Sequence, residues 1–158
     1  MVDMSINPQS AKPVKRREAR RLALLAQYAM ECNGYAAWDT LGLMCAFKPE
    51  WITMPEFTRL LCQTTEDHKA EIEHEIASVL EHWKYDRIAI VERAILKLAT
   101  AEILFFPDIP PRVTINEYIE LSKPYGSDQA PAFINGILDR IVHLRHKADF
   151  HVKQAGKK

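Results

Sequence analysis

Residues 88–106 read IAIVERAILKLATAEILFF and are the most apolar stretch of the chain. Apolar side chains such as Val91, Ile95 and Leu98 recur at the three- and four-residue spacing of one helix face, which predicts a central core helix over about 89–106. The stretch is too polar to span a membrane, because four charged residues interrupt it. They are Glu92, Arg93, Lys97 and Glu102.

Helical periodicity continues on both sides of this stretch, and nowhere does the two-residue alternation of strands compete with it. The sequence therefore predicts a compact, all-α fold of about six or seven helices. Besides the central helix, the expected ranges are 16–33 (ended by Asn33-Gly34), 36–47, 54–63, 65–83, 115–122 and 128–146. Residues 15–147 are expected to form one domain between a flexible N-terminal arm over 1–14 and a basic, flexible tail over 148–158.

The 158 residues carry 21 Lys and Arg against 21 Asp and Glu, but these charges are unevenly distributed. Residues 1–21 hold six basic and two acidic residues, residues 140–158 hold six and one, and residues 22–139 hold nine and eighteen. Because a polyanion responds to local potential, the zero net charge does not exclude a nucleic-acid partner. Two solvated basic tails are the simpler interpretation.

The cysteines argue against a disulfide or zinc framework. Cys32, Cys45 and Cys62 are odd in number and lack CxxC spacing. The first 21 residues contain no apolar segment of the kind that a secretory signal needs. A reducing, cytoplasmic location fits both observations.

Four arginines gather at the start of the first predicted helix. At 100° per residue, Arg16, Arg17, Arg20 and Arg21 fall within one arc of about 140°. Like charges on one face repel one another, and at a helix N-terminus they also oppose the helix dipole. An anionic partner would relieve this repulsion. Tyr28 falls in the same arc and is expected at the surface.

Glu102 lies in the middle of the apolar face of the predicted central helix, where a carboxylate needs hydrogen-bond donors. The sequence TINE, from Thr114 to Glu117 with Asn116 inside it, matches a capping box. We expect the N-terminus of a helix that opens at Ile115 to supply donors to Glu102. We prefer this structural role for Glu102 to a catalytic one, since no second catalytic group has an evident place beside it.

Gly136 lies inside the last predicted helix, where glycine costs about 1 kcal/mol relative to alanine, so close packing between helices is its expected reason. Trp38, Trp51 and Trp83 are most simply core or boundary residues. Trp83 also continues an apolar stripe that runs through Ile76 in the helix predicted over 65–83.

The motifs of common enzymes are absent from the sequence. It contains no GxGxxG, GxxxxGK[ST], GxSxG or HExxH, which excludes the usual nucleotide folds, hydrolase elbows and zincins. Asp139, His143 and His146 share one side of the last predicted helix. A metal site would need a second ligand-bearing element, so solvent-facing histidines are preferred, and no metal or cofactor is predicted.

Four segments in this order carry a resemblance to a known family. They are RREARRLALLAQY (16–28), WKYDRIAIVERAILKLATAEI (83–103), PDIPPRVTINEYIELSKPYG (107–126) and FINGILDR (133–140). Over roughly residues 15–145 the chain resembles the NusB family of bacterial transcription antitermination factors. The resemblance implies an all-α domain of two packed helical bundles. It also implies binding of boxA RNA from ribosomal RNA operons, together with the small-subunit ribosomal protein NusE, in the antitermination complex of RNA polymerase.

The resemblance assigns RNA phosphate contacts to Arg16, Arg17 and Arg20. Arginine forks suit phosphate oxygens and can stack on unpaired bases. The resemblance also places an aromatic side chain near the RNA at Phe133, although a core position is equally expected there.

Contact with the ribosomal protein is implied at Tyr28 and Glu92. An acidic surface that includes Glu75, Glu81 and Glu92 would complement a basic ribosomal protein, and a solvated acidic face is the simpler alternative.

The chain departs from the family pattern at several positions. Gln63 stands near a common glycine, Ala101 near a common tyrosine, and Gln129 where an acidic residue is frequent. Glu18 also lies within the arginine cluster. These departures bear on the shape of the RNA groove and on the strength of binding.

Two other functions compete with RNA binding. A protein-only interaction module, such as a homodimer that buries the arginines and Tyr28, is the first. The second is an enzyme, because this domain precedes an RNA cytosine methyltransferase in some relatives. The chain ends at Lys158, too early for a cofactor-binding domain, so we expect no catalysis.

Overall fold

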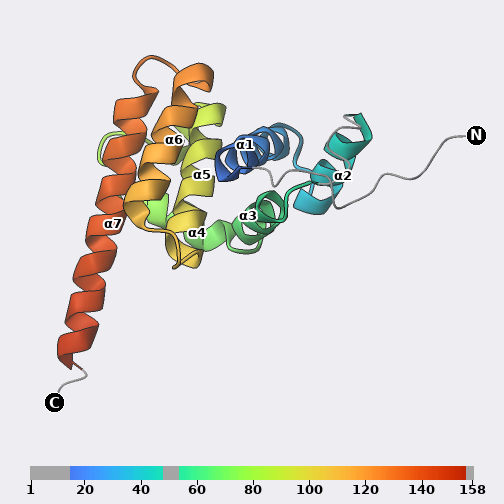
Figure 1. The fold of residues 1–158 in the computed structure, drawn as a ribbon. Coiled ribbons are helices and arrows are strands. Elements are labelled where there is room, and N and C mark those ends of the chain that lie inside the picture. The colour runs from blue at the N-terminus through green and yellow to red at the C-terminus, as the bar shows by residue number, and fades with distance from the viewer. Residues whose placement is uncertain (1–14, 48–53, 156–158) are drawn as a thin grey trace, which may run out of the picture.

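The computed structural model describes residues 15–47 and 54–155, with side chains as far as 149, and these residues form helices. The helices are α1 (Arg16–Asn33), α2 (Ala37–Phe47), α3 (Glu56–Asp67), α4 (Lys69–Ser78), the short 3₁₀ helix η2 (Tyr85–Arg87), α5 (Ile90–Phe105), α6 (Pro111–Tyr125) and α7 (Ala130–Ala155) (Figure 1). The all-α prediction is confirmed. The arm expected over 1–14 and the side chain of Trp51 lie outside the described residues.

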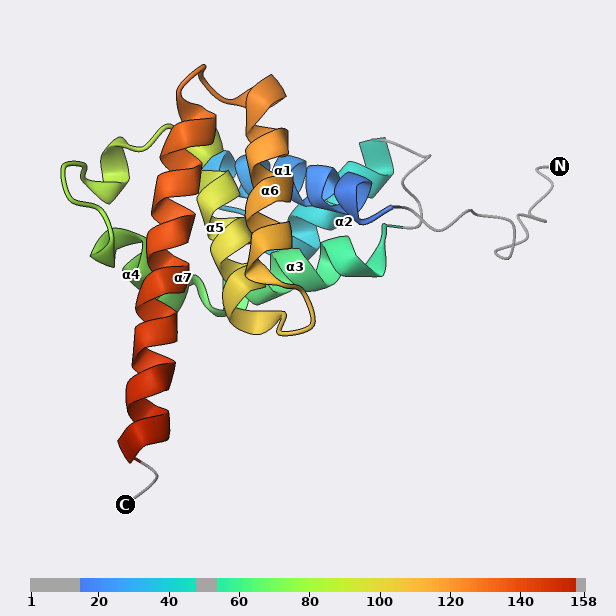
Figure 2. The same ribbon diagram turned by 60° about the vertical axis from the view of Figure 1, so that its left-hand side comes forward.

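Helix α5 occupies the centre of the fold, as its apolar sequence predicted. It packs against α1 and α3 on one side and against α4, α6 and α7 on the other (Figures 1 and 2). Every residue from Ala94 to Glu102 is buried. The helices thus form two packed bundles that share α5, and α2 lies at the edge, against α1 and α3.

The ends of α1 and α6 show one correct prediction and one error. Gly34 takes a left-handed φ of 72° and donates its N–H to the Met30 carbonyl over 2.9 Å, which ends α1 as expected. Helix α6, however, begins at Pro111, so the predicted capping box at Thr114 is wrong. Proline suits the first helical position, because it lacks the N–H that would be unpaired there and its φ is already helical.

Helix α7 is longer than the sequence suggested. It continues past His146 to Ala155, and its C-terminal part projects beyond the other helices in both views (Figures 1 and 2). Residues 148–155, which were expected in a flexible tail, thus continue α7, while 156–158 lie outside the described residues. No glycine or proline interrupts the chain between Ile137 and Ala155, and these residues are the strongest helix breakers.

Two predictions about packing are wrong. A Cβ added at Gly136 would meet nothing within 4 Å, so close contact between helices does not explain this glycine. Helix α4 ends at Ser78, which leaves Trp83 in the following loop with 61% of its surface exposed rather than in an apolar stripe. Trp38 on α2 is also exposed, at 74%.

Among the described residues, none of the helices combines the length and the hydropathy needed to cross a membrane.

Candidate nucleic-acid interface

Arg16 opens α1 with an exposed side chain. Its guanidinium carbon lies 4.8 Å from the centre of the Phe57 ring on α3, a cation–π contact that orients the side chain without neutralising its charge. No carboxylate of the described residues forms an ion pair with Arg16. The guanidinium is therefore available to an anion, and its contact with RNA stays a prediction.

Arg17 is exposed but paired. Its Nε and Nη2 each donate a hydrogen bond of 2.9 Å to the carboxylate of Glu117 on α6. Glu117, expected in a capping box, instead accepts these bonds, which lower its pKa. The Arg17 side chain is 66% exposed, and ion pairs in such positions are worth less than about 1 kcal/mol. A phosphate can therefore replace Glu117 at Arg17.

Arg20 does not reach this surface, which corrects its assignment to RNA phosphate. Only 3% of the residue is exposed, and its Nε donates to Oε2 of Glu102 over 3.0 Å. Burial alone would lower the pKa of Arg20, but the hydrogen bonds and charge of Glu102 outweigh it and raise the pKa. Arg20 is thus the buried counterion of Glu102.

Glu102 has a buried structural environment, with donors other than those expected. It accepts from Arg20 on α1 and, over 2.9 Å, from the Thr114 hydroxyl on α6. Burial raises the pKa of the neighbouring Tyr118 hydroxyl, and the charge of Glu102 raises it further. Three helices therefore meet at one carboxylate, whereas Asn116 of the expected box is exposed.

The error at Arg20 has a simple physical origin. Because α1 packs against both α3 and α5, a wider arc of this helix is buried than its apolar face alone would suggest. The additional buried residues are Arg20, Leu24 and Gln27. A helical wheel of α1 places an arginine at the surface, because the wheel contains no information about partners elsewhere in the chain. The partner of Arg20, Glu102, lies 82 positions away. The carboxylate in the apolar stretch was the available signal that a cation had to lie in the core.

Arg21, the fourth arginine of the cluster, is paired along its own helix. Its Nε donates to Glu18 over 2.8 Å. Hydrogen bonds to Glu18 and then to Tyr125 raise the pKa of Arg21. The start of α1 therefore presents Arg16 without a carboxylate partner among the described residues, and Arg17 and Arg21 in exchangeable ion pairs.

The side chains implied in contact with the ribosomal protein occupy different surroundings. Tyr28 is 44% exposed on α1, as expected. Glu92, in the first turn of α5, is half-buried and accepts a 2.9 Å hydrogen bond from the Ser127 hydroxyl. Their contact with a partner is not visible in an isolated chain and stays a prediction.

Helix α7 partly neutralises the predicted acidic surface. Arg145 lies 3.3 Å from a carboxylate oxygen of Glu75, and Arg140 lies 3.6 Å from one of Glu81. These two carboxylates therefore already have cations from the same chain, which lowers the charge that they offer to a basic partner.

Phe133 packs partly in the core, and its contact with RNA stays a prediction. It is half-buried and packs on the core, yet it also lines two surface hollows together with Trp83. Gln129, one of the departures from the family pattern, is exposed at the edge of one of these hollows. The departures at Gln63 and Ala101 lie elsewhere. Gln63 is exposed and donates to Asp67, whereas Ala101 is in the core.

Sequence reasoning missed a second charged cluster. The Lys97 ammonium, 4% exposed, lies 2.5 Å from a carboxylate oxygen of Glu31 and 2.9 Å from one of Glu73. Arg93 also pairs with Glu31, over 3.3 Å. Lys97 interrupts the same apolar stretch as Glu102, so the same reasoning would have predicted that this ammonium needs acidic partners, though not which residues supply them.

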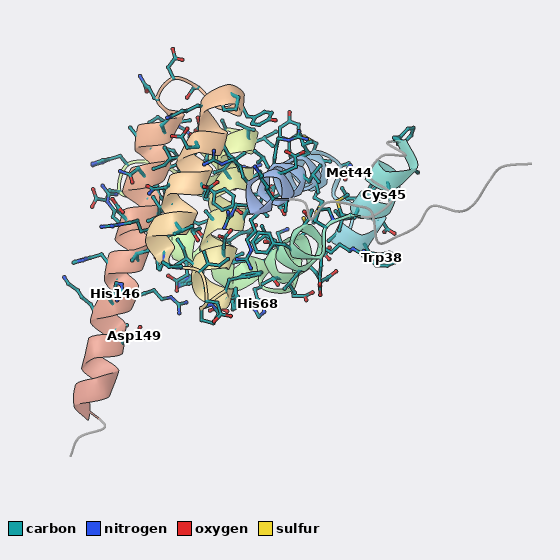
Figure 3. All side chains as sticks on the ribbon, viewed as in Figure 1. Trp38, Met44, Cys45, His68, His146 and Asp149 are labelled. Atoms are coloured by element: carbon teal, nitrogen blue, oxygen red, sulfur yellow. The ribbon has the colours of Figure 1, made fainter. Side chains whose placement is uncertain are left out.

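The described residues contain no group of three or more His, Cys, Asp or Glu that could hold a metal ion. Asp139, His143 and His146 are all exposed on α7, and Figure 3 labels His146 on this helix. The start of α1 presents two exposed guanidinium groups, those of Arg16 and Arg17.

Comparison with known sequences identifies similar proteins. The family model described as the NusB family matches residues 17–143. A transcription antitermination protein NusB of Desulfitobacterium hafniense is 40% identical over 140 residues, which cover 86% of this chain and 93% of that protein. The corresponding protein of Syntrophus aciditrophicus is 36% identical over 133 residues, which cover 84% of this chain and 83% of that protein.

Solved structures share the fold. NusB of T. maritima superposes with a TM-score of 0.71 at 31% identity, covering 82% of this chain and 92% of that chain. A crystal structure of antitermination factors NusB and NusE in complex with dsRNA gives a TM-score of 0.68 at 27% identity, and the match covers 80% of this chain and 94% of that chain.

Proposed function

Because this chain belongs to the NusB family, we propose that it is a transcription antitermination factor that binds boxA-type single-stranded RNA together with NusE. The observation that carries the proposal is the exposed pair of guanidinium groups, Arg16 and Arg17, on the first turn of α1. A similar fold has been solved with both NusE and RNA, which supports the same partners here. We propose that the chain acts without catalysis, as an adaptor in the cytoplasm, where RNA is transcribed.

Binding of a labelled boxA-type RNA tests this function. The titration is made at two salt concentrations, with and without NusE, and against a scrambled RNA. We expect sequence-selective binding that NusE strengthens. Binding of NusE with no preference between the two RNAs would contradict the proposal and favour a protein-only module, and a dimer that RNA cannot dissociate would favour a homodimer that buries Tyr28.

The double variant Arg16→Ala with Arg17→Ala is expected to bind every RNA more weakly. Each phosphate contact on a single strand contributes about 0.7 to the slope of log K against log salt, so two lost contacts reduce the slope by about 1.4. At 0.1 M salt this corresponds to roughly 25-fold weaker binding. Filter binding over a series of salt concentrations measures both quantities.

The matched control for this variant is Lys69→Ala with Arg145→Ala, which removes two positive charges from α4 and α7. It is expected to change the salt slope by less than half as much. Equal slopes in the two double variants would show that net charge, rather than the start of α1, determines RNA affinity.

Glu117→Gln is expected to strengthen RNA binding by roughly two- to fivefold, because RNA then no longer displaces a carboxylate from Arg17. The same titration at low salt measures this change. Glu120→Gln, on the same helix and paired with Lys123 rather than Arg17, removes an identical charge and serves as the control. An equal gain in both variants would contradict a specific contact at Arg17.

A further inference from the structure

The loop that follows α4 exposes a large aromatic side chain. Trp83 lies between α4 and η2 with 61% of its surface exposed. Exposure of an indole to water is unfavourable, and tryptophan is among the residues that most often dominate binding surfaces. Its position outside the core therefore needs a reason other than folding.

Trp83 and Phe133 line two neighbouring hollows. The first, of about 140 Å³, is lined also by Arg87, Ile88, Glu92, Ser127 and Gln129. The second, of about 210 Å³, is lined also by Leu80, Glu81, His82, Ala132, Gly136, Ile137 and Arg140. The two rings do not stack on each other, since the ring contacts among the described side chains involve other residues. Part of each ring thus borders the hollows, although Phe133 also packs against the core.

Gly136 lies one helical turn after Phe133, on the wall of the second hollow. Glycine is unfavourable inside a helix, and here an added Cβ would meet no atom within 4 Å. The fold therefore gives no reason for a glycine at this position. Glycine also serves where a ligand approaches the backbone closely, and that reason fits a surface hollow. A residue type that is unfavourable for its local secondary structure is expected at functional sites more than elsewhere.

The size and the aromatic lining of the hollows favour a nucleobase over a protein segment. Both are smaller than the roughly 300–1,000 Å³ of drug-sized pockets, and a helix about 10 Å across cannot enter them. Arg87 lines the first hollow, and Arg140 lines the second, where its exposed pair with Glu81 at 3.6 Å is weak enough for a phosphate to replace. Single-stranded RNA is held by this combination, with splayed bases stacked on aromatic rings and phosphates near cations.

Helix α6 connects these hollows to the start of α1. Glu117, which holds Arg17, lies two helical turns before Tyr125, about 12 Å along the helix. Ser127, just beyond that end, donates to Glu92 in the first hollow. The residues just after α6 therefore line the first hollow, on the same helix connection as the partner of Arg17.

We propose that Trp83 and Phe133 hold one unpaired RNA base over Gly136, with Arg87 and Arg140 near its flanking phosphates. This inference rests on the proposed RNA-binding function and adds Trp83, Gly136 and the two arginines to its surface. The base contributes affinity through stacking, so any of the four bases can occupy the hollow.

Trp83→Ala and Gly136→Ala test this site, with RNA affinity and Tm measured for each. Trp83→Ala is expected to weaken RNA binding at least about fivefold, and Trp83→Phe to retain most of the affinity. Gly136→Ala is expected to weaken RNA binding while raising Tm by roughly 2–4 °C, because alanine favours the helix but fills the hollow. A structural role for Gly136 would change Tm alone.

Trp38→Ala is the matched control. This tryptophan is also exposed, and it lies on α2, away from α7 (Figure 3). It is expected to leave RNA affinity unchanged. If the unmodified protein binds no RNA, the proposed function fails. If it binds RNA and Trp83→Ala and Gly136→Ala bind equally well, the base site alone is overturned. Unchanged RNA affinity with weaker NusE binding would assign the hollow to a protein contact and also overturn it.

Discussion

Arg20→Met is expected to lower the free energy of unfolding by about 3–5 kcal/mol. The substitution leaves the Glu102 carboxylate fully buried without a counterion, and the Thr114 hydroxyl on α6 still donates a hydrogen bond to it. An uncompensated charge in the core is far more costly than the loss of one surface contact. Urea unfolding followed by circular dichroism at neutral pH measures the change.

Two further variants separate the buried charge from the loss of a side chain. Arg20→Met combined with Glu102→Met removes both charges at similar volume, and its stability is expected to return to within about 1–2 kcal/mol of the original protein or to exceed it. Arg16→Met, at an exposed position, is expected to change stability by less than about 0.5 kcal/mol. A single Arg20→Met variant as stable as Arg16→Met would contradict the counterion role.

This expectation decides how RNA-binding variants should be chosen. Arg20 belongs to the same sequence cluster as Arg16 and Arg17, yet its loss would weaken RNA binding by unfolding the bundle. Variants at Arg16 and Arg17 report on the surface, because neither guanidinium is buried.

The sequence was sufficient for the fold wherever a local signal existed. The apolar period placed α5 within one residue at each end, and Asn33-Gly34 located the end of α1. The start of α6 was misplaced because two signals competed, and Pro111 at the first helical position prevailed over the capping box at Thr114. Local rules rank such signals poorly when they lie within one turn of each other.

The candidate site was less predictable, because its geometry depends on contacts between distant segments. Arg20 lies in the core because it pairs with Glu102. Trp83 lies in a loop because α4 ends five residues earlier, and no glycine or proline in the sequence marks that helix end. Tyr85 packs against Arg93 and Lys97 just after this loop, so tertiary contacts determine where the chain turns. None of these contacts has a local sequence signature.

Lys97→Met is expected to lower the free energy of unfolding by about 2–3 kcal/mol at neutral pH, because Glu31 then loses its main counterion. In the native protein, burial would raise the pKa of Glu31, but the hydrogen bond and charge of Lys97 outweigh it and lower the pKa. Arg93 and Gln27 remain as partners in the variant, which keeps the loss below that expected for Arg20→Met.

The same variant is expected to change the response to acid. A carboxyl group whose pKa is lower in the folded state contributes stability above its unfolded value of about 4.3, and this contribution is lost as the pH falls through the folded pKa. Without Lys97 the pKa of Glu31 rises, so acid no longer removes that contribution. The stability gap between the two proteins should therefore be widest above about pH 4.3 and should narrow as the pH falls below this value, through the lowered folded pKa of Glu31, in urea unfolding.

Lys123→Met provides the control for this acid response. Lys123 pairs with Glu120 at the surface, where both side chains are more than half exposed. Its replacement is expected to cost less than about 1 kcal/mol and to leave the acid dependence unchanged. A gap between Lys97→Met and the original protein that stays constant with pH would mean that Lys97 stabilises the bundle by packing its side chain, rather than by holding Glu31 ionised between α1 and α5.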